Sequence, residues 1–432
     1  MFKRHDWTIL ALILILSVIG LFTLLSTNID IEGNIDLGGV FSRQVTFMLT
    51  GLVIYFLVSL ANPTYLRYPQ ILVPVSLVII AVLLYVVLAG PVINNVRRWI
   101  VIGGVQVQPS EFAKIIVIFT TAAIFTIRNH FDDLLLGILS FLPQIPILLL
   151  IYLEPHGSMT MITLLIWGIL VITYMREQRR NILLFVLMFS ATGSSLLLLN
   201  GTVGLGILFA IASVTILVLT SYRIEELRKL LIIVTIAGVI VGGALNFSWN
   251  DLLKDYQRER IETFFDPEGV DVDQSFNVEQ SKVAIGSGGI WGKGFGSGSQ
   301  SRLQYVPEHQ TDFIFATYAE QFGLVGSMIL IVLYALLILK GLLYAYKMSS
   351  QDIFSSMVIF GISIKLLIEV FINIGTNTGL IPATGIPLPL LSAGGTNIVV
   401  TFFSFGIIQS IISSSQEVFQ HELLIDNEDL LI

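Results

Sequence analysis

Asp312 is the residue whose type and position best suit chemistry, because it joins a polar, glycine-rich stretch to the start of an apolar helix. Residues 280–326 read QSKVAIGSGGIWGKGFGSGSQSRLQYVPEHQTDFIFATYAEQFGLVG. A carboxylate in this position can act as a general base. It can also be a helix-terminal residue that the helix dipole stabilises by ~0.3–1 kcal/mol. The residues alone give these two interpretations equal weight.

A single general base can activate a hydroxyl group as a nucleophile, and nearby cations can stabilise an anionic leaving group. Several Arg and Lys side chains are available for this, although a solvated position is the default for each: Arg97, Arg98, Arg258, Arg260, Lys282 and Lys293. Further candidate substrate contacts are Glu308, Ser392, Gly394 and Gly395. A divalent cation (Mg or Mn) could assist, but no ligand spacing specifies a metal site.

The glycine run at 286–298 matches neither nucleotide-binding pattern, since Lys293 precedes Gly294 rather than Ser or Thr and no G-x-G-x-x-G occurs. We expect its glycines to permit tight turns and a close approach of the backbone to a ligand.

The surrounding sequence is typical of a membrane protein, with 55% hydrophobic residues, 12% charged residues and a mean hydropathy of +0.86. We predict an all-α, polytopic helical bundle that forms one membrane domain over 1–432. No basic tract suggests a nucleic-acid partner, and the absence of cysteine excludes thiolate chemistry. About twelve apolar runs can span the membrane: 7–26, 45–61, 70–89, 110–127, 134–153, 158–175, 181–200, 203–221, 230–248, 312–340, 353–372 and 396–413.

The distribution of Lys and Arg predicts the orientation of these spans. With the N-terminus inside, the inner loops hold twelve Lys and Arg residues and the short outer loops hold three. Both termini are therefore expected in the cytoplasm, with 414–432 as an acidic cytoplasmic tail. The long loop 249–311, which leads to Asp312, is then extracytoplasmic.

Three other segments carry polar residues at span ends. Glu111 and Lys114 are three apart at a helix start, so we predict a structural ion pair. Lys365 and Glu369 are four apart within a span, and we expect them to neutralise each other inside the bundle. The turn 153–160 carries Glu154 and His156, and a histidine in such a turn is more often solvated than catalytic. The segment 373–397 is rich in Gly and Pro, which predicts a re-entrant or broken helix that lines a cavity near Asp312.

Several of these segments resemble the SEDS family (shape, elongation, division, sporulation) of bacterial membrane glycosyltransferases. The similar segments are RRWI with QPSEFAK, YQRERI, QSKVAIGSGGIWGKGF, PEHQTDFIFA and TGIPLPLLSAGG, in the order of the family. The glycine-rich loop and TGIPLPL are more similar to the elongation branch than to the division branch. The resemblance covers nearly the whole chain.

Three positions depart from the family pattern. Gln310 stands where the family usually has His, Ala393 replaces a Tyr, and Glu154-Pro155-His156 replaces a turn that often reads Gln-Pro-Asp. The family typically has ten spans, so residues 181 to about 220 look like two additional helices.

The resemblance implies a peptidoglycan glycosyltransferase that polymerises lipid II, an undecaprenyl-linked disaccharide peptide, at the outer face of the bacterial cell membrane. It favours Asp312 as the catalytic base over a helix cap. The leaving group of this reaction is a lipid diphosphate, which departs without being protonated, so one base with cations on the diphosphate would suffice. It also implies a partner, a class B penicillin-binding protein, in addition to membrane lipids. The rival hypothesis is a lipid II flippase, although the chain shows no inverted repeat and its functional-looking charges gather at the outer surface.

Overall fold

The structure is a computed structural model, and most of the chain outside the segment 178–271 is described. The described residues are 5–29, 38–61, 63–93, 96–154, 156–177, 180, 186–187, 190–195, 207, 210–211, 214–215, 232, 235–236, 238–240, 242–243, 272–298 and 308–429. The chain divides into two compact units, Met1–Val171 with Asp271–Ile432 and, separately, Ile172–Val270. We expected one domain over 1–432. The second unit includes residues 181 to about 220, for which we expected two additional helices and most of which lie outside the described residues.

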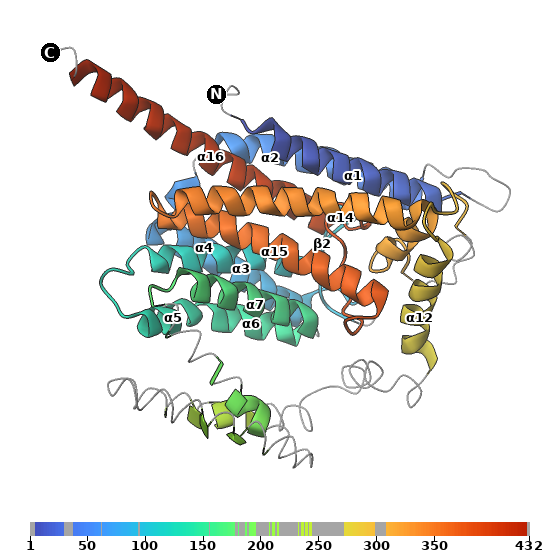
Figure 1. Cartoon of the computed structure of the whole chain (residues 1–432), viewed down its shortest axis with the longest axis horizontal. Helices are drawn as coiled ribbons and strands as arrows, with labels where there is room; N and C mark the ends of the chain where they lie inside the picture. The colour runs from blue at the N-terminus through green and yellow to red at the C-terminus, as the bar shows by residue number, and fades with distance from the viewer. Residues whose placement is uncertain are drawn as a thin grey trace. The chain divides into compact units, whose positions relative to one another are not determined.

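Helices dominate the described residues, and one short hairpin interrupts them (Figure 1). In chain order the elements are α1 Trp7–Thr27, α2 Gly39–Leu60, η2 Pro63–Arg67, α3 Pro69–Ala89, β1 Ile100–Ile102, β2 Val105–Val107, α4 Pro109–Phe125, α5 Asp133–Phe141, α6 Gln144–Leu153, α7 Gly157–Tyr174, α12 Val272–Ser287, α14 Ile314–Met348, α15 Ile353–Thr378 and α16 Gly395–Asp429.

Among the described residues, seven helices are long and apolar enough to cross a membrane, and the bent pair α5 and α6 can form an eighth span. The helix α4, with 17 residues, is only slightly shorter. These elements coincide with nine of the expected spans. The expected spans 181–200, 203–221 and 230–248 lie for the most part outside the described residues, so the count of twelve stays a prediction. The helix α16 continues to Asp429, through most of the segment that we expected as a tail.

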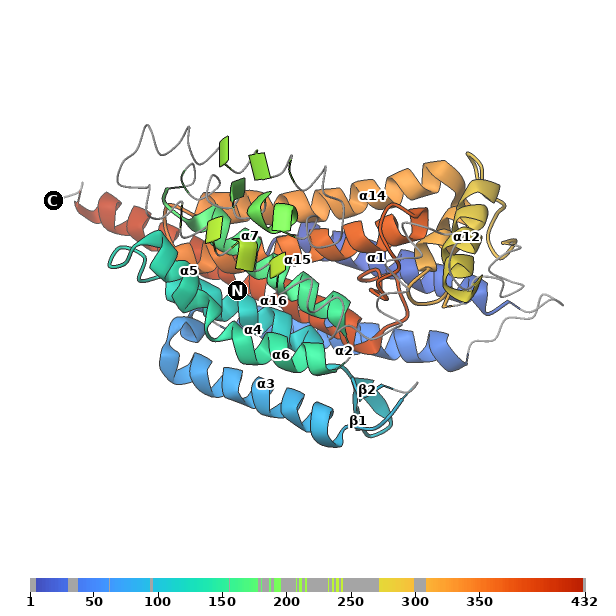
Figure 2. The same ribbon diagram turned by 90° about the horizontal axis from the view of Figure 1, so that it is seen from below.

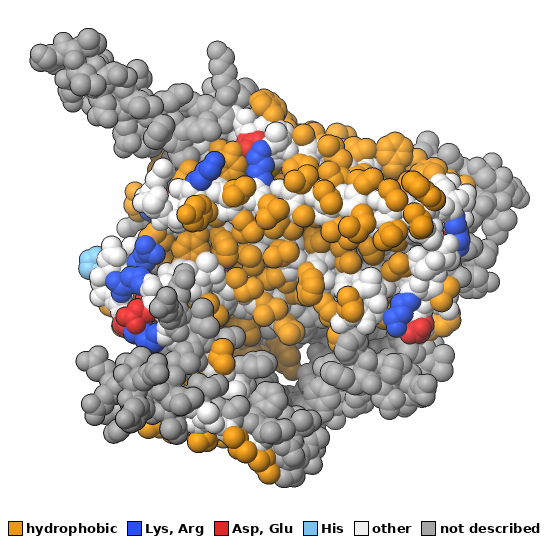
Figure 3. All heavy atoms as spheres, viewed as in Figure 1, with side chains coloured by type: hydrophobic (Ala, Val, Ile, Leu, Met, Phe, Trp, Pro, Cys, Tyr) orange, Lys and Arg blue, Asp and Glu red, His pale blue; other side chains and the backbone are white. Residues whose placement is uncertain are grey.

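The distribution of burial separates core helices from lipid-facing ones. In an apolar stretch of 18 residues within α3, only 17% is buried, against 67% for the equivalent stretch of α15 and 78% for that of the first part of α16. Figure 3 shows hydrophobic side chains over the middle of one face of the helices, with charged side chains toward the ends. This arrangement fits a bundle whose rim faces lipid and whose centre, at α4, α15 and α16, is shielded from it.

One end of the bundle gathers residues that the distribution of Lys and Arg places in the cytoplasm. Lys340 pairs with Asp6 at 2.8 Å, and Arg67 pairs with Asp352 at 2.6 Å. The main-chain N–H of Asp6 donates to Gln409 at 3.3 Å. These contacts place the start of α1, the connection from α2 to α3, the turn from α14 to α15 and part of α16 at one end, as expected for these spans. The assignment of this end to the cytoplasm stays a prediction.

Between α15 and α16 the backbone is irregular from Gly379 to Gly394. Tyr334 of α14 donates to the carbonyl of Pro389, and a Cβ atom on Gly20 of α1 would lie 2.5 Å from the carbonyl oxygen of Leu390. Gln44 of α2 donates to the carbonyl of Ser392 at 2.9 Å. Neighbouring helices thus supply hydrogen bonds and cover for a segment that could not be exposed to lipid.

Candidate functional site

The main chain of Asp312 is held by two asparagines of α15. Its carbonyl oxygen accepts hydrogen bonds from Asn373 Nδ2 at 2.8 Å and Asn377 Nδ2 at 2.9 Å. Asn377 Oδ1 in turn accepts from the main-chain N–H of Ala316, in the first turn of α14, at 3.0 Å. One side chain therefore fixes the backbone of Asp312 and also caps the helix that follows it.

The helix cap is not Asp312 itself. The N-cap residue of α14 is Phe313, which has no side-chain capping bond, and Asp312 lies one residue earlier. The carboxylate of Asp312 lies beside Gly385, where an added Cβ atom would be 3.6 Å from Asp312 Oδ2. A glycine with φ of +70° at this point keeps the irregular segment from placing a side chain against the carboxylate.

The residues just before Asp312 are bonded to the irregular segment. Ser392 Oγ donates to the carbonyl of Thr311 at 2.6 Å and accepts from the N–H of Leu388 at 2.7 Å. The N–H of Ala393 donates to the carbonyl of Gln310 at 2.8 Å. The expected proximity of Ser392 to the Asp312 loop is confirmed. Its hydroxyl is occupied with backbone groups, and its role as a substrate contact stays a prediction.

Gly394 and Gly395 lie against α2. The N–H of Gly394 donates to Gln44 Oε1 at 3.2 Å, and a Cβ atom on Gly395 would lie 2.5 Å from the ring of Phe47. The close approach of Phe47 explains why position 395 suits glycine. A direct role in substrate binding stays a prediction for both glycines.

Part of the expected loop 249–311 is helical, which the sequence analysis missed. The helix α12 covers Val272–Ser287, and its Ala284 forms a small apolar cluster with Phe313 and Ala316. Ser281 Oγ also donates to the carbonyl of Asn377 at 2.9 Å. The helix forms because this apolar side can pack on the start of α14, a partner that is invisible in the local sequence.

The glycine-rich stretch packs on a break in α14. Gly323 has non-helical angles (φ 65°, ψ −163°), and the N–H groups of Leu324 and Val325 donate to the carbonyls of Gly289 (2.9 Å) and Ile290 (3.1 Å). A Cβ atom on Gly292 would lie 2.1 Å from the carbonyl oxygen of Gln321. Our expectation that these glycines approach a ligand is wrong at Gly292, because there the backbone approaches α14.

The candidate cations occupy separate positions, and each of the four described has a partner. Arg97 donates to the carbonyl of Leu88 at 2.8 Å, and Arg98 donates to that of Glu154 at 3.1 Å. Lys282 pairs with Glu279 at 2.8 Å, and its side chain lies against Gly379 at the end of α15. Lys293 pairs at 2.7 Å with the buried Glu320.

Arg258 and Arg260 lie outside the described residues. Glu308 is exposed, has a φ of 52° and accepts a hydrogen bond from the hydroxyl of Thr311 at 2.9 Å. These observations leave the roles proposed for Arg258, Arg260 and Glu308 as predictions.

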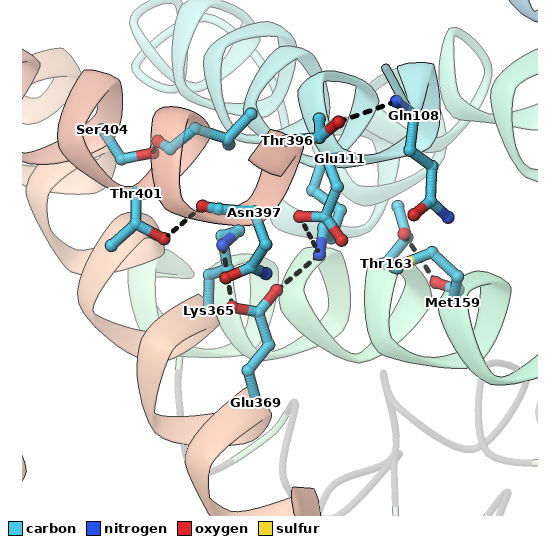
Figure 4. Close-up of polar contacts among 12 residues, drawn as sticks. Gln108, Glu111, Met159, Thr163, Lys365, Glu369, Thr396, Asn397, Thr401 and Ser404 are labelled. Carbon is cyan, nitrogen blue, oxygen red and sulfur yellow. Dashed lines mark hydrogen bonds and ion pairs between the residues drawn. The ribbon is translucent and has the colours of Figure 1, made fainter. Parts of the chain in front are cut away.

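The two expected ion pairs are present, and the fold joins them into one buried network (Figure 4). Lys114 of α4 lies 2.9 Å from Glu111 and 2.5 Å from Glu369 of α15. Glu369 also pairs with Lys365 at 2.8 Å. All four side chains are at most 4% exposed. Two cations and two anions thus balance inside the bundle, which reduces the cost of burying each one.

The turn after α6 is buried, so our expectation of a solvated His156 is wrong. His156 is 7% exposed, and its Nδ1 lies 3.1 Å from Gln108 Nε2. Glu154 is fully buried, and neither carboxylate oxygen has a hydrogen-bond partner among the described residues. Burial raises the pKa of Glu154 to about 8, although the positive charge of Arg98 acts to lower it.

Asn373 and Asn377 were missed by the sequence analysis. Two amides one helical turn apart near the end of an apolar span are a detectable signal, because uncompensated polar groups are costly there. Within the described part of the chain, no group of three or more His, Asp or Glu side chains could hold a metal ion.

Comparisons with known proteins place this geometry in context. Residues 4–417 match the family FtsW/RodA/SpoVE, described as cell cycle proteins. The peptidoglycan glycosyltransferase MrdB of Escherichia coli K12 is 33% identical over 376 residues, which cover 86% of this chain and 85% of MrdB. A probable peptidoglycan glycosyltransferase, FtsW of Bacillus subtilis 168, is 27% identical over 95% of this chain and 91% of its own length.

Solved structures share the fold. A crystal structure of the Thermus thermophilus rod shape determining protein RodA has a TM-score of 0.57 and 20% identity, covering 94% of this chain and 96% of its own. A chain from a study of the structural coordination of polymerization and crosslinking by a peptidoglycan synthase complex has a TM-score of 0.61 and 22% identity. It covers 95% of this chain and 98% of its own.

Proposed function

Because the chain belongs to the FtsW, RodA and SpoVE family, whose members are the SEDS proteins, we propose that it is a peptidoglycan glycosyltransferase of the cell membrane. Its substrate is lipid II, which it polymerises into glycan strands with release of undecaprenyl diphosphate. We assign it to cell elongation or shape maintenance, on the basis of its glycine-rich loop and TGIPLPL segment. A role in cell division is also compatible with the similarity to the relatives named FtsW.

One observation carries the assignment of the site: the backbone of Asp312 is fixed by Asn373 and Asn377 at the head of α14. A positioned carboxylate can take the proton from the 4-hydroxyl of an acceptor sugar as that oxygen attacks the anomeric carbon of the donor. The new glycosidic bond forms while the bond from the anomeric carbon to the diphosphate oxygen breaks. The diphosphate leaves as an anion, so no second carboxylic acid has to protonate it.

Cations would stabilise the departing diphosphate. Lys282 is the best placed of the described candidates, because its side chain lies against Gly379 at the end of α15. The preceding residue, Ser281, donates a hydrogen bond to the carbonyl of Asn377. A divalent cation, Mg or Mn, bound by the diphosphate oxygens would add to this stabilisation. Lys293 instead secures the glycine-rich stretch to α14 through Glu320, which makes it a structural residue in this proposal.

We extend the proposal to a partner, a class B penicillin-binding protein that crosslinks the new strands. The structural neighbour from a peptidoglycan synthase complex supports this extension through the shared fold. Both termini are assigned to the cytoplasm, on the side where Lys340 pairs with Asp6. Co-purification from native membranes tests the partner.

The test of the function is polymerisation of purified lipid II by the wild type and by Asp312→Asn, with the partner present. Asparagine keeps the size of the side chain but cannot accept the proton, so the rate should fall by ~10²-fold or more. Unchanged melting temperatures would show that both proteins are folded. Glu177→Gln is the matched control, because it removes an exposed carboxylate, which pairs with Arg180 three residues away.

Polymerisation by Asp312→Asn at a rate near that of the wild type would refute the catalytic assignment. A wild type that translocates lipid II without polymerising it would instead support the flippase.

A further inference from the structure

The hairpin β1–β2 has an unusual composition for a water-exposed element. Its strands pair antiparallel with Ile100 opposite Val107 and Ile102 opposite Val105. Gly103 and Gly104 form the turn with φ of 58° and 83°, which is the geometry of a tight two-residue hairpin. The sequence IVIGGVQV thus places β-branched apolar side chains on both faces, and Gln106 is its only polar residue.

The tip of the hairpin is exposed. Ile102 is 64% exposed, Val101 47% and Val105 38%. An isolated two-stranded hairpin is only marginally stable in water. This one is secured at its base, where Thr396 of α16 donates to the carbonyl of Gln106 at 3.2 Å and accepts from the N–H of Gln108 at 3.0 Å. The fold therefore holds the apolar tip outward rather than burying it.

The hairpin continues the lipid-facing surface of α3. Figure 2 shows it beside the end of α3. Leu88, near the end of that helix, is 67% exposed, and Val92, between the helix and the hairpin, is 60% exposed. Arg97 connects the two elements, since its Nη1 donates to the carbonyl of Leu88 at 2.8 Å. Arg97 is itself exposed, so its guanidinium lies at the level where α3 ends.

The length of α3 sets that level. Its 21 residues span about 32 Å, which matches a hydrocarbon core of ~30 Å. The carbonyl of Leu88 therefore lies at the boundary between acyl chains and headgroups. Arg and Trp are among the residues that favour this boundary, and Arg97 and Trp99 lie within the three residues before β1.

We propose that residues 96–107 form an interfacial membrane anchor. Val101, Ile102 and Val105 lie among the headgroups and first methylenes of one lipid leaflet, and Arg97 binds lipid phosphate. The anchor holds the start of α4, and with it Glu111 and Lys114, at a constant depth, because β2 leads directly into that helix. This inference requires only that the chain spans a membrane and is independent of the proposed catalysis.

A lipid surface fits this patch better than a protein partner. The exposed tip offers three apolar side chains, whereas a stable protein interface uses ~20–30 residues on each side. The neighbouring surface of α3 also faces lipid, since only 17% of the apolar 18-residue stretch of this helix is buried in the protein. The cation at the edge of the patch suits the phosphate groups of a bilayer.

The chain has no cysteine, so a single spin label can be placed without removing native residues. Ile102→Cys would carry a nitroxide in the full-length protein, reconstituted in vesicles of phosphatidylethanolamine and phosphatidylglycerol. Power saturation compares the access of oxygen, which partitions into lipid, with that of a water-soluble nickel chelate. We expect oxygen access to exceed nickel access at position 102 and at Val105→Cys, on the opposite strand.

Two reference positions calibrate the measurement. Leu77→Cys, on the exposed face of α3, should show the strongest preference for oxygen, and Gln351→Cys, in the exposed turn after α14, should prefer nickel. A label at 102 that behaves like the label at 351 would overturn the anchor, since the hairpin would then lie in water. Low access to both reagents would also overturn it, because a protein surface or a second copy would then cover the tip.

Discussion

Replacement of Lys114 by Met should destabilise the protein strongly, and removal of Glu111 in the same chain should restore part of the loss. Lys114 is the only ion-pair partner of Glu111 among the described residues, at 2.9 Å. Glu369, in contrast, keeps Lys365 at 2.8 Å when Lys114 is gone. The single change therefore leaves one buried carboxylate, Glu111, without a compensating charge.

The expected magnitude follows from this charge balance. Leaving a buried charge unpaired costs about 3–5 kcal/mol of unfolding free energy. In the variant Glu111→Gln with Lys114→Met, the remaining pair Lys365–Glu369 is neutral and no charge is left alone. We therefore expect the double variant to be more stable than Lys114→Met by about 1–3 kcal/mol, although it carries one more substitution.

The assay is unfolding of the purified protein by SDS in mixed micelles, followed by tryptophan fluorescence. A control combines Lys114→Met with Glu177→Gln, which removes an exposed carboxylate elsewhere and should restore nothing. If the double variant at 111 and 114 is destabilised by the sum of the two single changes, the two side chains are not coupled and the network explanation is wrong.

Three further predictions concern individual positions. Asn377→Ala should lower kcat for lipid II polymerisation more than it raises KM, because Asp312 loses a backbone restraint. A loss of lipid II affinity as large as the loss of kcat would contradict this. Gly292→Ala should lower the melting temperature and increase protease cleavage near 290, since its Cβ would meet the carbonyl of Gln321 at 2.1 Å; an unchanged melting temperature would contradict the packing. Glu154 has a folded-state pKa of about 8, above its usual 4.5, so the folded protein retains a proton that the unfolded chain loses. The stability contributed by this group should fall as pH rises from about 4.5 to 8, and Glu154→Gln should stabilise the protein more at pH 8 than at pH 5; the same difference at both pH values would refute this assignment.

Several features of this protein could be predicted from local sequence because their physical cause is local. Apolar runs of about 20 residues predict spans wherever they occur, and nine of them coincide with described helices. The pairs Glu111–Lys114 and Lys365–Glu369 follow from helical spacing, which places side chains three or four residues apart on one face. The Gly and Pro content of 373–397 likewise predicts irregular backbone, whatever surrounds it.

Other features depend on contacts between residues far apart in the chain. The 2.5 Å contact between Lys114 and Glu369 joins two predicted pairs, and no periodicity could show that α4 and α15 are neighbours. The helix α12 needs the apolar start of α14 before its own apolar side is buried. Asp312 illustrates both limits: the junction of a polar loop with an apolar helix identifies the residue. Only the packing of α15 against that junction supplies Asn373 and Asn377, because a hydrogen bond needs its partners within about 3 Å, and the fold alone determines which groups come that close.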